Sequence, residues 1–263
     1  MSLMSHPEAA EWYERGKESW LLEDFARSLA DAAKVTTGDR ILDVGCGTGI
    51  VARECARRVG EAGSVSGIDI SEEMLAVARR VAPGLDWHLG DARELPFGDG
   101  SFDRVVSQFA LMFFPEREKA ITEMWRVLRP GGGLSIAVLG GIPPAYQRLA
   151  ELAERHLDSG AGEIIESRFV PSDPERLERI FSEAGLGAIT LETVKGVQRF
   201  RSPAVFVDLE VGATARLAAR FNETSVGAFV RDVEAAIQDH LSEEGEVEIP
   251  MSAHIVTADK PST

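Results

Sequence analysis

The chain has 263 residues, of which 44% are hydrophobic and 27% charged, a composition that indicates one large globular domain and excludes a fibrous or disordered protein. Its 43 Asp and Glu outnumber its 28 Lys and Arg, and the resulting formal charge of -15 disfavours a nucleic acid as partner. No apolar run reaches the ~18 residues of a membrane span, and residues 1–10 lack the pattern of a signal peptide, so we expect a cytoplasmic protein.

The cysteines and histidines carry no metal-binding pattern. Cys46 and Cys55 fit a reducing compartment, and we expect them to be small buried side chains rather than a disulfide. The five histidines show none of the spacings of metal ligands, so the sequence predicts no metal site.

The first half of the chain alternates strands and helices. In the N-terminal segment, apolar side chains recur at helical spacing and predict a helix that ends before residue 38. The predicted strands cover residues 40–44, 64–70, 85–89, 102–107 and 134–139. Ser71 follows the second strand and is placed to cap the next helix. Since strands separated by helices need crossover connections, this half predicts a doubly wound, mainly parallel α/β sheet.

The second half is less regular and is expected to add a helical cap to the same domain. Two further strands are predicted, at 188–194 and 247–257. The predicted helices cover residues 143–157, 173–184, 204–220 and 226–241. We therefore expect a single domain over residues 1–263. Its N-terminal helical segment, ligand-binding core and two cap segments are expected at residues 1–37, 38–140, 141–172 and 203–242.

A glycine-rich turn after the first strand is the strongest sign of a ligand site. Gly45, Gly47 and Gly49 give a G-x-G-x-G spacing, and such a turn brings bare backbone and the N–H groups of a helix close to a ligand. The turn alone suits a dinucleotide, a phosphate or a nucleoside. The dinucleotide fingerprint needs G-x-G-x-x-G, whereas position 50 is Ile50. Asp43 suits a ligand with a cationic amino group better than a pyrophosphate, which favours an amino-acid-bearing cofactor.

The run from Ile41 to Gly49 resembles the first motif of the class I S-adenosylmethionine-dependent methyltransferases. Later landmarks of that family are matched in order by Asp69, Gly90-Asp91-Ala92, Phe102 to Gln108 and Val127 to Gly132. The resemblance covers roughly residues 38–140 and implies a Rossmann-like, seven-stranded sheet with strand order 3-2-1-4-5-7-6. Within the family, the chain is most similar to the small-molecule group that includes the ubiquinone and menaquinone biosynthesis C-methyltransferases.

The resemblance also implies the cofactor, S-adenosylmethionine, the product S-adenosylhomocysteine, and the residues that bind them. In that family the acid matched by Asp69 accepts hydrogen bonds from both ribose hydroxyls, and the segment matched by Asp91 binds the adenine edge. The residues expected to bind the cofactor are Asp43, Gly45, Gly47, Gly49, Asp69, Ile70, Met74, Asp91, Ala92 and Gln108.

Aromatic residues indicate the class of acceptor. Phe109 and Phe113 follow the fourth strand, where the family places the methyl group, and an apolar lining there suits a small apolar or aromatic molecule. Trp20, and with it Tyr13, lies in the N-terminal segment that family members often fold over the cofactor; packing of that helix is the alternative role. No catalytic base is predicted, because alignment of the reactants can supply much of the rate enhancement.

Three functions remain open from the sequence. The first is methyl transfer from S-adenosylmethionine to a small molecule. The second is a sensor or partner subunit that binds S-adenosylmethionine without transferring its methyl group. The third, an NAD(P)-dependent oxidoreductase, is disfavoured by Ile50 and Asp43. The sequence fits either a monomer or a homodimer.

Overall fold

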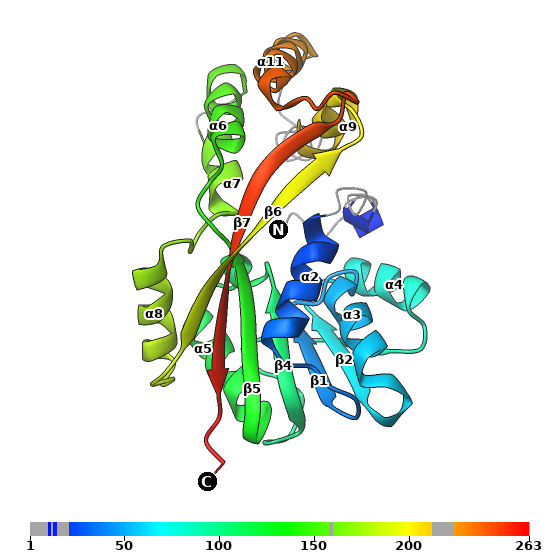
Figure 1. The fold of residues 1–263 in the computed structure, drawn as a ribbon. Helices are drawn as coiled ribbons and strands as arrows, with labels where there is room; N and C mark the ends of the chain where they lie inside the picture. The colour runs from blue at the N-terminus through cyan, green and yellow to red at the C-terminus, as the bar shows by residue number, and fades with distance from the viewer. Residues whose placement is uncertain (1–9, 12, 15–20, 158–159, 212–222, 263) are drawn as a thin grey trace.

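The structure is a computed structural model, and it describes residues 10–11, 13–14, 21–157, 160–211 and 223–262. A seven-stranded sheet runs through it in the order β3-β2-β1-β4-β5-β7-β6 (Figure 1). The strands are β1 (Arg40–Val44), β2 (Ser64–Asp69), β3 (Asp86–Leu89), β4 (Phe102–Gln108), β5 (Leu128–Leu139), β6 (Thr190–Phe200) and β7 (Val247–Asp259). β7 runs antiparallel to both of its neighbours, whereas β3, β2, β1, β4 and β5 pair in parallel. The predicted fold class and strand order are therefore confirmed.

Helices cover both faces of the sheet, so the central strands are buried on both sides, as the burial of Ile41, Leu42 and Val44 in β1 shows. One face carries α2 (Leu21–Ala32), α3 (Ile50–Val59) and α4 (Glu72–Val81), and the other α5 (Arg117–Val127) and α8 (Pro174–Glu183) (Figure 1). Successive side chains of β1 point to opposite faces. Ile41 is buried with Leu29 of α2 and Val51 of α3, whereas Leu42 is buried with residues of α5 and α8.

The helix ends follow the sequence signals. The hydroxyl oxygen of Ser71 accepts a hydrogen bond from the N–H of Met74 at 3.3 Å and so caps α4, as predicted. Asp173 caps α8 in the same way, with Pro174 in its first turn. The described chain also contains the short helical turns η2 (Gly60–Ala62), η3 (Leu111–Phe113) and η5 (Gln238–His240).

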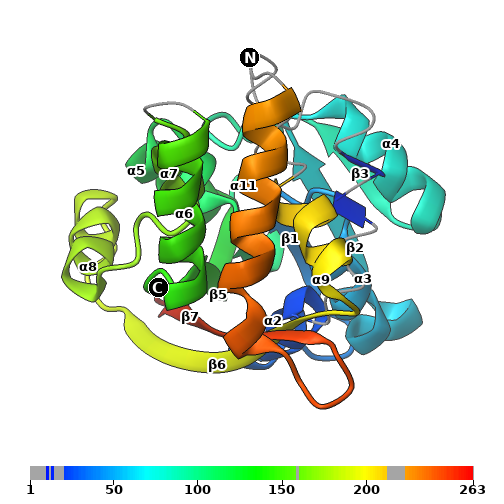
Figure 2. The ribbon, with the colours of Figure 1, turned by 90° about the horizontal axis from the view of Figure 1, so that it is seen from above.

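A group of helices lies beyond the ends of the parallel strands, around the extended parts of β6 and β7 (Figures 1 and 2). We call this group the upper cluster; it contains α6 (Pro144–His156), α7 (Ala161–Ser167), α9 (Pro203–Phe206), the π-helical segment η4 (Val207–Val211) and α11 (Glu223–Ala236). Its core includes Leu149, Phe200, Phe206 and Phe229. α6 and α11 lie side by side in Figure 2, joined by a 2.8 Å contact between Nε2 of His156 and a carboxylate oxygen of Asp232.

The second half differs from its predicted elements in four places. The helix predicted at 226–241 is α11, which ends at Ala236 and is followed by the separate turn η5. β6 continues to Phe200, beyond the predicted end at 194, because its outer residues pair with β7 alone. α7 was not predicted. Of the helix predicted at 204–220, the structure describes only α9 and η4, and the remainder lies outside the described residues.

Cys46 and Cys55 are both buried and free, as predicted. Among the described residues, no helix combines the length and apolar character needed to cross a membrane.

Candidate active site

The glycine turn joins the end of β1 to the start of α3, at the carboxyl edge of the parallel strands. Gly45, Gly47 and Gly49 have φ values of 69°, 54° and 84°, in the left-handed region that favours glycine. Space also limits two of them. A Cβ on Gly45 would lie 2.4 Å from that of Ala110, and one on Gly49 would lie 2.3 Å from the indole of Trp87. The turn therefore requires glycine for backbone conformation and for close packing.

Asp69, the last residue of β2, is held against this turn. One carboxylate oxygen accepts a hydrogen bond from the N–H of Gly47 at 2.8 Å, and the other from the N–H of Ser71 at 2.9 Å. Burial raises the pKa of Asp69, although these N–H groups act in the opposite direction. Each carboxylate oxygen has a second lone pair, so Asp69 can also accept hydrogen bonds from a ligand.

Asp43 lies beneath the turn and is only 1% exposed. Its carboxylate accepts a hydrogen bond from the N–H of Ala52 in the first turn of α3, at 3.1 Å. Burial raises its pKa to about 7, and the nearby charge of Asp69 adds to the increase. The turn is thus flanked by two acidic side chains, one deeply buried and one within reach of a ligand.

The ends of β2 and β3 carry the residues expected near the adenine. Ile70 is 69% exposed, an unusual position for a large apolar side chain, whereas Met74 is buried against Ala10. Asp91 is bonded by the guanidinium of Arg93, at 2.7 Å for the shortest contact, which lowers its pKa. Ala92 beside it is buried. The sequence interpretation did not identify Arg93, which lies two residues after Asp91.

The end of β4 brings together the residues expected near the methyl group. The amide nitrogen of Gln108 donates to the carbonyl oxygen of Leu22 in α2 at 3.1 Å. Phe109 has a φ of 53°, strained for a non-glycine residue, and its ring meets that of Phe25 edge-on at 5.5 Å. Phe113 is 54% exposed. Trp20 lies outside the described residues.

Residues from the N-terminal segment also reach the glycine turn. A Cβ built on Gly47 would lie 3.9 Å from the ring of Tyr13. Burial raises the pKa of the Tyr13 phenol to about 12, and the charges of Asp69 and Asp43 contribute to this rise. Tyr13 therefore lies close to Gly47 and also packs against the apolar cluster of Ala10 and Met74, so both roles expected for it stay predictions.

Two buried polar atoms near the turn lack hydrogen-bond partners in the described part of the chain, which bears on whether a polar cofactor fits there. Among the described residues, the hydroxyl of Thr48 in the turn and the amide oxygen of Gln108 are buried and have no hydrogen-bond partner. Buried polar atoms are normally bonded, and a ligand with hydrogen-bonding groups would provide the missing partners. With the exposed Ile70 and the bare glycine backbone, the residues present fit a nucleoside that carries an amino acid.

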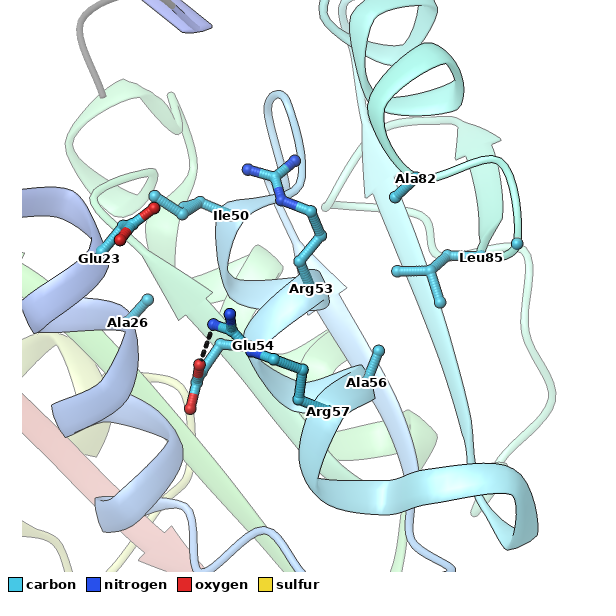
Figure 3. A pocket seen from close by; sticks show the side chains of 10 residues that line it. Glu23, Ala26, Ile50, Arg53, Glu54, Ala56, Arg57, Ala82 and Leu85 are labelled. Carbon is cyan, nitrogen blue, oxygen red and sulfur yellow. Dashed lines mark hydrogen bonds and ion pairs between the residues drawn. The ribbon is translucent and has the colours of Figure 1, made fainter. Parts of the chain in front are cut away.

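A surface hollow of about 420 Å³ lies beside this site, between α2, α3 and the loop that precedes β3 (Figure 3). None of the residues predicted to bind cofactor or substrate lines it. Arg53, on the first turn of α3, belongs to both places, because it lines the hollow and donates to the carbonyl oxygen of Thr48 at 2.7 Å. The sequence interpretation did not identify Arg53.

Comparisons with known proteins agree with this geometry. Residues 41–132 match the family described as methyltransferase domain. The methyltransferase GfsG of Streptomyces halstedii is 34% identical over 201 residues, covering 72% of this chain and 67% of that protein. The ubiquinone/menaquinone biosynthesis C-methyltransferase UbiE of Yersinia pestis is 31% identical over 190 residues, covering 65% of this chain and 75% of that protein.

Solved structures share the fold. A putative methyltransferase from an antibiotic biosynthesis pathway of Anabaena variabilis superposes with a TM-score of 0.65 at 18% identity, covering 89% of this chain and 96% of that one. At that identity the similarity concerns the fold alone.

Proposed function

Since the chain belongs to the class I S-adenosylmethionine-dependent methyltransferases, we propose that it transfers a methyl group from S-adenosylmethionine to a small apolar or aromatic acceptor. The observation that carries this proposal is the bond between the carboxylate of Asp69 and the N–H of Gly47, at 2.8 Å. It places a hydrogen-bond acceptor beside bare backbone at the carboxyl edge of a parallel sheet, where open α/β sheets bind their ligands.

Each part of the cofactor has a matching group in this arrangement. In the proposal, Asp69 accepts hydrogen bonds from the ribose hydroxyls. The buried carboxylate of Asp43 attracts a cationic amino group through its charge, without contacting it. The exposed side chain of Ile70 packs against the adenine, and Asp91 with Ala92 meets its edge. Gln108 uses its unpaired amide oxygen to accept a hydrogen bond from the cofactor. Met74 lies in the first turn of α4 and is buried, so in the proposal it supports the adenine subsite from within the protein.

The acceptor is proposed to bind where β4 ends. When bound, the cofactor supplies an electrophilic methyl group on a sulfonium, which an acceptor atom displaces in line. Phe109 and Phe113 provide apolar surface for such an acceptor and exclude water from it. In this proposal, the described helices of the upper cluster form the roof of this space.

Alignment of the acceptor is the main task of the protein in this proposal. Holding two reactants in line can supply on the order of 7 to 11 kcal/mol of barrier reduction. The strained backbone of Phe109 fits this task, since an aromatic ring fixed by its backbone and by contact with Phe25 loses little freedom when an acceptor packs against it.

The proposal is tested first by binding. Isothermal titration calorimetry of the purified protein with S-adenosylhomocysteine is expected to give saturable binding that Asp69→Ala weakens by about a hundredfold, because charge-assisted hydrogen bonds to two hydroxyls are lost. The matched control is Asp86→Ala, because Asp86 is an exposed acid at the start of β3, away from the edge of the sheet that carries the glycine turn. Absence of saturable binding would refute the proposal.

Turnover separates an enzyme from a sensor. Incubation of the protein with S-adenosylmethionine and a library of small aromatic and apolar molecules is expected to release S-adenosylhomocysteine. Cofactor binding without such release, across acceptors of every class, would favour the sensor or partner subunit instead.

A further inference from the structure

Binding of the cofactor's amino-acid end poses an electrostatic problem for the proposed site. That end carries an ammonium and a carboxylate. The residues expected from the sequence include Asp43 and Asp69 but no cation, and two acidic side chains would repel the carboxylate of the ligand. A complete site for such a zwitterion therefore needs a positively charged group near the glycine turn.

Arg53 is positioned to provide this charge. Its side chain runs back along the first turn of α3, and Nη1 donates to the carbonyl oxygen of Thr48 at 2.7 Å. Figure 3 shows that Arg53 points away from Arg57, one helical turn later, whose guanidinium instead pairs with Glu54. Arg53 thus contacts the glycine turn directly, whereas Arg57 does not.

Among the described residues, the positive charge of Arg53 is only weakly neutralised by a carboxylate. Its nearest described carboxylate oxygen, on Glu14, lies 3.9 Å away, too far for a hydrogen bond. Arg53 is also 23% exposed and lies near the N-terminus of α3, where the helix dipole disfavours a cation. Burial lowers the pKa of its guanidinium. An anionic ligand at the turn would stabilise this partly buried positive charge.

A second observation concerns Thr48, the residue of the glycine turn that Arg53 contacts. The buried hydroxyl of Thr48 lacks a partner among the described residues, and Arg53 bonds the carbonyl oxygen of that same residue. A guanidinium has five N–H groups, so Arg53 can keep this bond and still hold a carboxylate. Arginine is also well suited to carboxylates because it can bond both oxygens at once.

We propose that Arg53 binds the α-carboxylate of S-adenosylmethionine and exchanges its long contact with Glu14 for that ligand. This inference rests on the proposed function and adds to it the residue that recognises the amino-acid end of the cofactor.

The test compares two ligands that differ only in the carboxylate, S-adenosylmethionine and decarboxylated S-adenosylmethionine, each titrated by calorimetry without an acceptor. Arg53→Gln is expected to weaken the binding of S-adenosylmethionine by about tenfold or more, the usual effect of losing a charged hydrogen bond. The same variant should not weaken the binding of the decarboxylated ligand, which also shows that the variant is folded.

Arg57→Gln is the matched control, because Arg57 lies on the same helix and is 68% exposed. It should change neither affinity. The inference is overturned if Arg53→Gln weakens both ligands equally or neither, or if Arg57→Gln has the same effect as Arg53→Gln. If the unaltered protein binds neither ligand, the proposed function fails together with this inference, an outcome distinct from a defect confined to Arg53.

Discussion

Replacing Asp43 by Asn should stabilise the protein at alkaline pH. The Asp43 carboxyl is 1% exposed and its pKa is raised from 3.8 to about 7, with burial as the largest cause. At about 1.36 kcal/mol per pKa unit, this rise corresponds to an upper limit of about 4 kcal/mol for charging the group in the folded state. The amide of the Asp43→Asn variant keeps an oxygen that can accept from the N–H of Ala52 but carries no charge.

The pH dependence follows from proton linkage. Between 3.8 and about 7 the folded protein binds more protons at this site than the unfolded chain, so the contribution of Asp43 to the free energy of unfolding falls as pH rises and levels off above about 7. At pH 5 part of this loss has occurred, and at pH 8 nearly all of it. The advantage of Asp43→Asn over the unaltered protein should therefore grow by about 2 to 3 kcal/mol from pH 5 to pH 8.

Urea unfolding of both proteins at the two pH values, without cofactor, measures this difference. Titrating groups far from Asp43 are common to the two proteins and cancel in the comparison, whereas Asp69, whose charge interacts with Asp43, contributes to the measured difference. If the stability difference between the two proteins is the same at both pH values, Asp43 is not the titrating group that we infer.

Three further comparisons test packing and hydrogen bonding, two of them at the site and one where α5 ends. Gly49→Ala should lower the free energy of unfolding by about 2 to 4 kcal/mol, because its Cβ would meet Trp87 at 2.3 Å. Gly185→Ala, with a φ of 86° against 84° for Gly49 and with open space around it, should lose only about 1 kcal/mol. Equal losses in urea unfolding would contradict the packing argument. Phe109→Gly should be more stable than Phe109→Ala by about 1 kcal/mol, since glycine tolerates a φ of 53°, and the reverse order of melting temperatures would argue against strain. Lys260→Met should lower the free energy of unfolding by about 1 to 2 kcal/mol, because the ammonium donates at 2.6 and 2.7 Å to main-chain carbonyls where α5 ends. An unchanged melting temperature would show that these bonds contribute nothing to stability.

The first half of the fold was predictable because local signals and packing agree there. β1 and β4 are short apolar strands buried on both faces, and Ser71 caps α4 through a local hydrogen bond. The outer half of β6 carries no comparable signal. Lys195 and Gly196 interrupt its apolar pattern, and its strand conformation depends on pairing with β7, which lies far along the chain.

The site was predictable only where one residue type is required at one position. The glycines of the turn and the acids at the ends of β1 and β2 belong to a motif with fixed spacing. The placement of Arg53 depends on how α3 packs, and an arginine in an amphipathic helix gives no signal of its own. The packing of Trp87 against both Gly49 and Gly67 likewise arises from three separate elements.

The extended parts of β6 and β7 affect how the upper cluster can move. β5 accompanies β7 only as far as the pair of Leu139 with Ala253, so beyond that point the two long strands form a ladder with each other alone. A two-stranded ladder bends and twists as a unit but does not swing like a disordered linker. In the proposed function, adapting the upper cluster to a bulkier or slimmer acceptor should therefore depend on side-chain replacement along the inner surfaces of its helices.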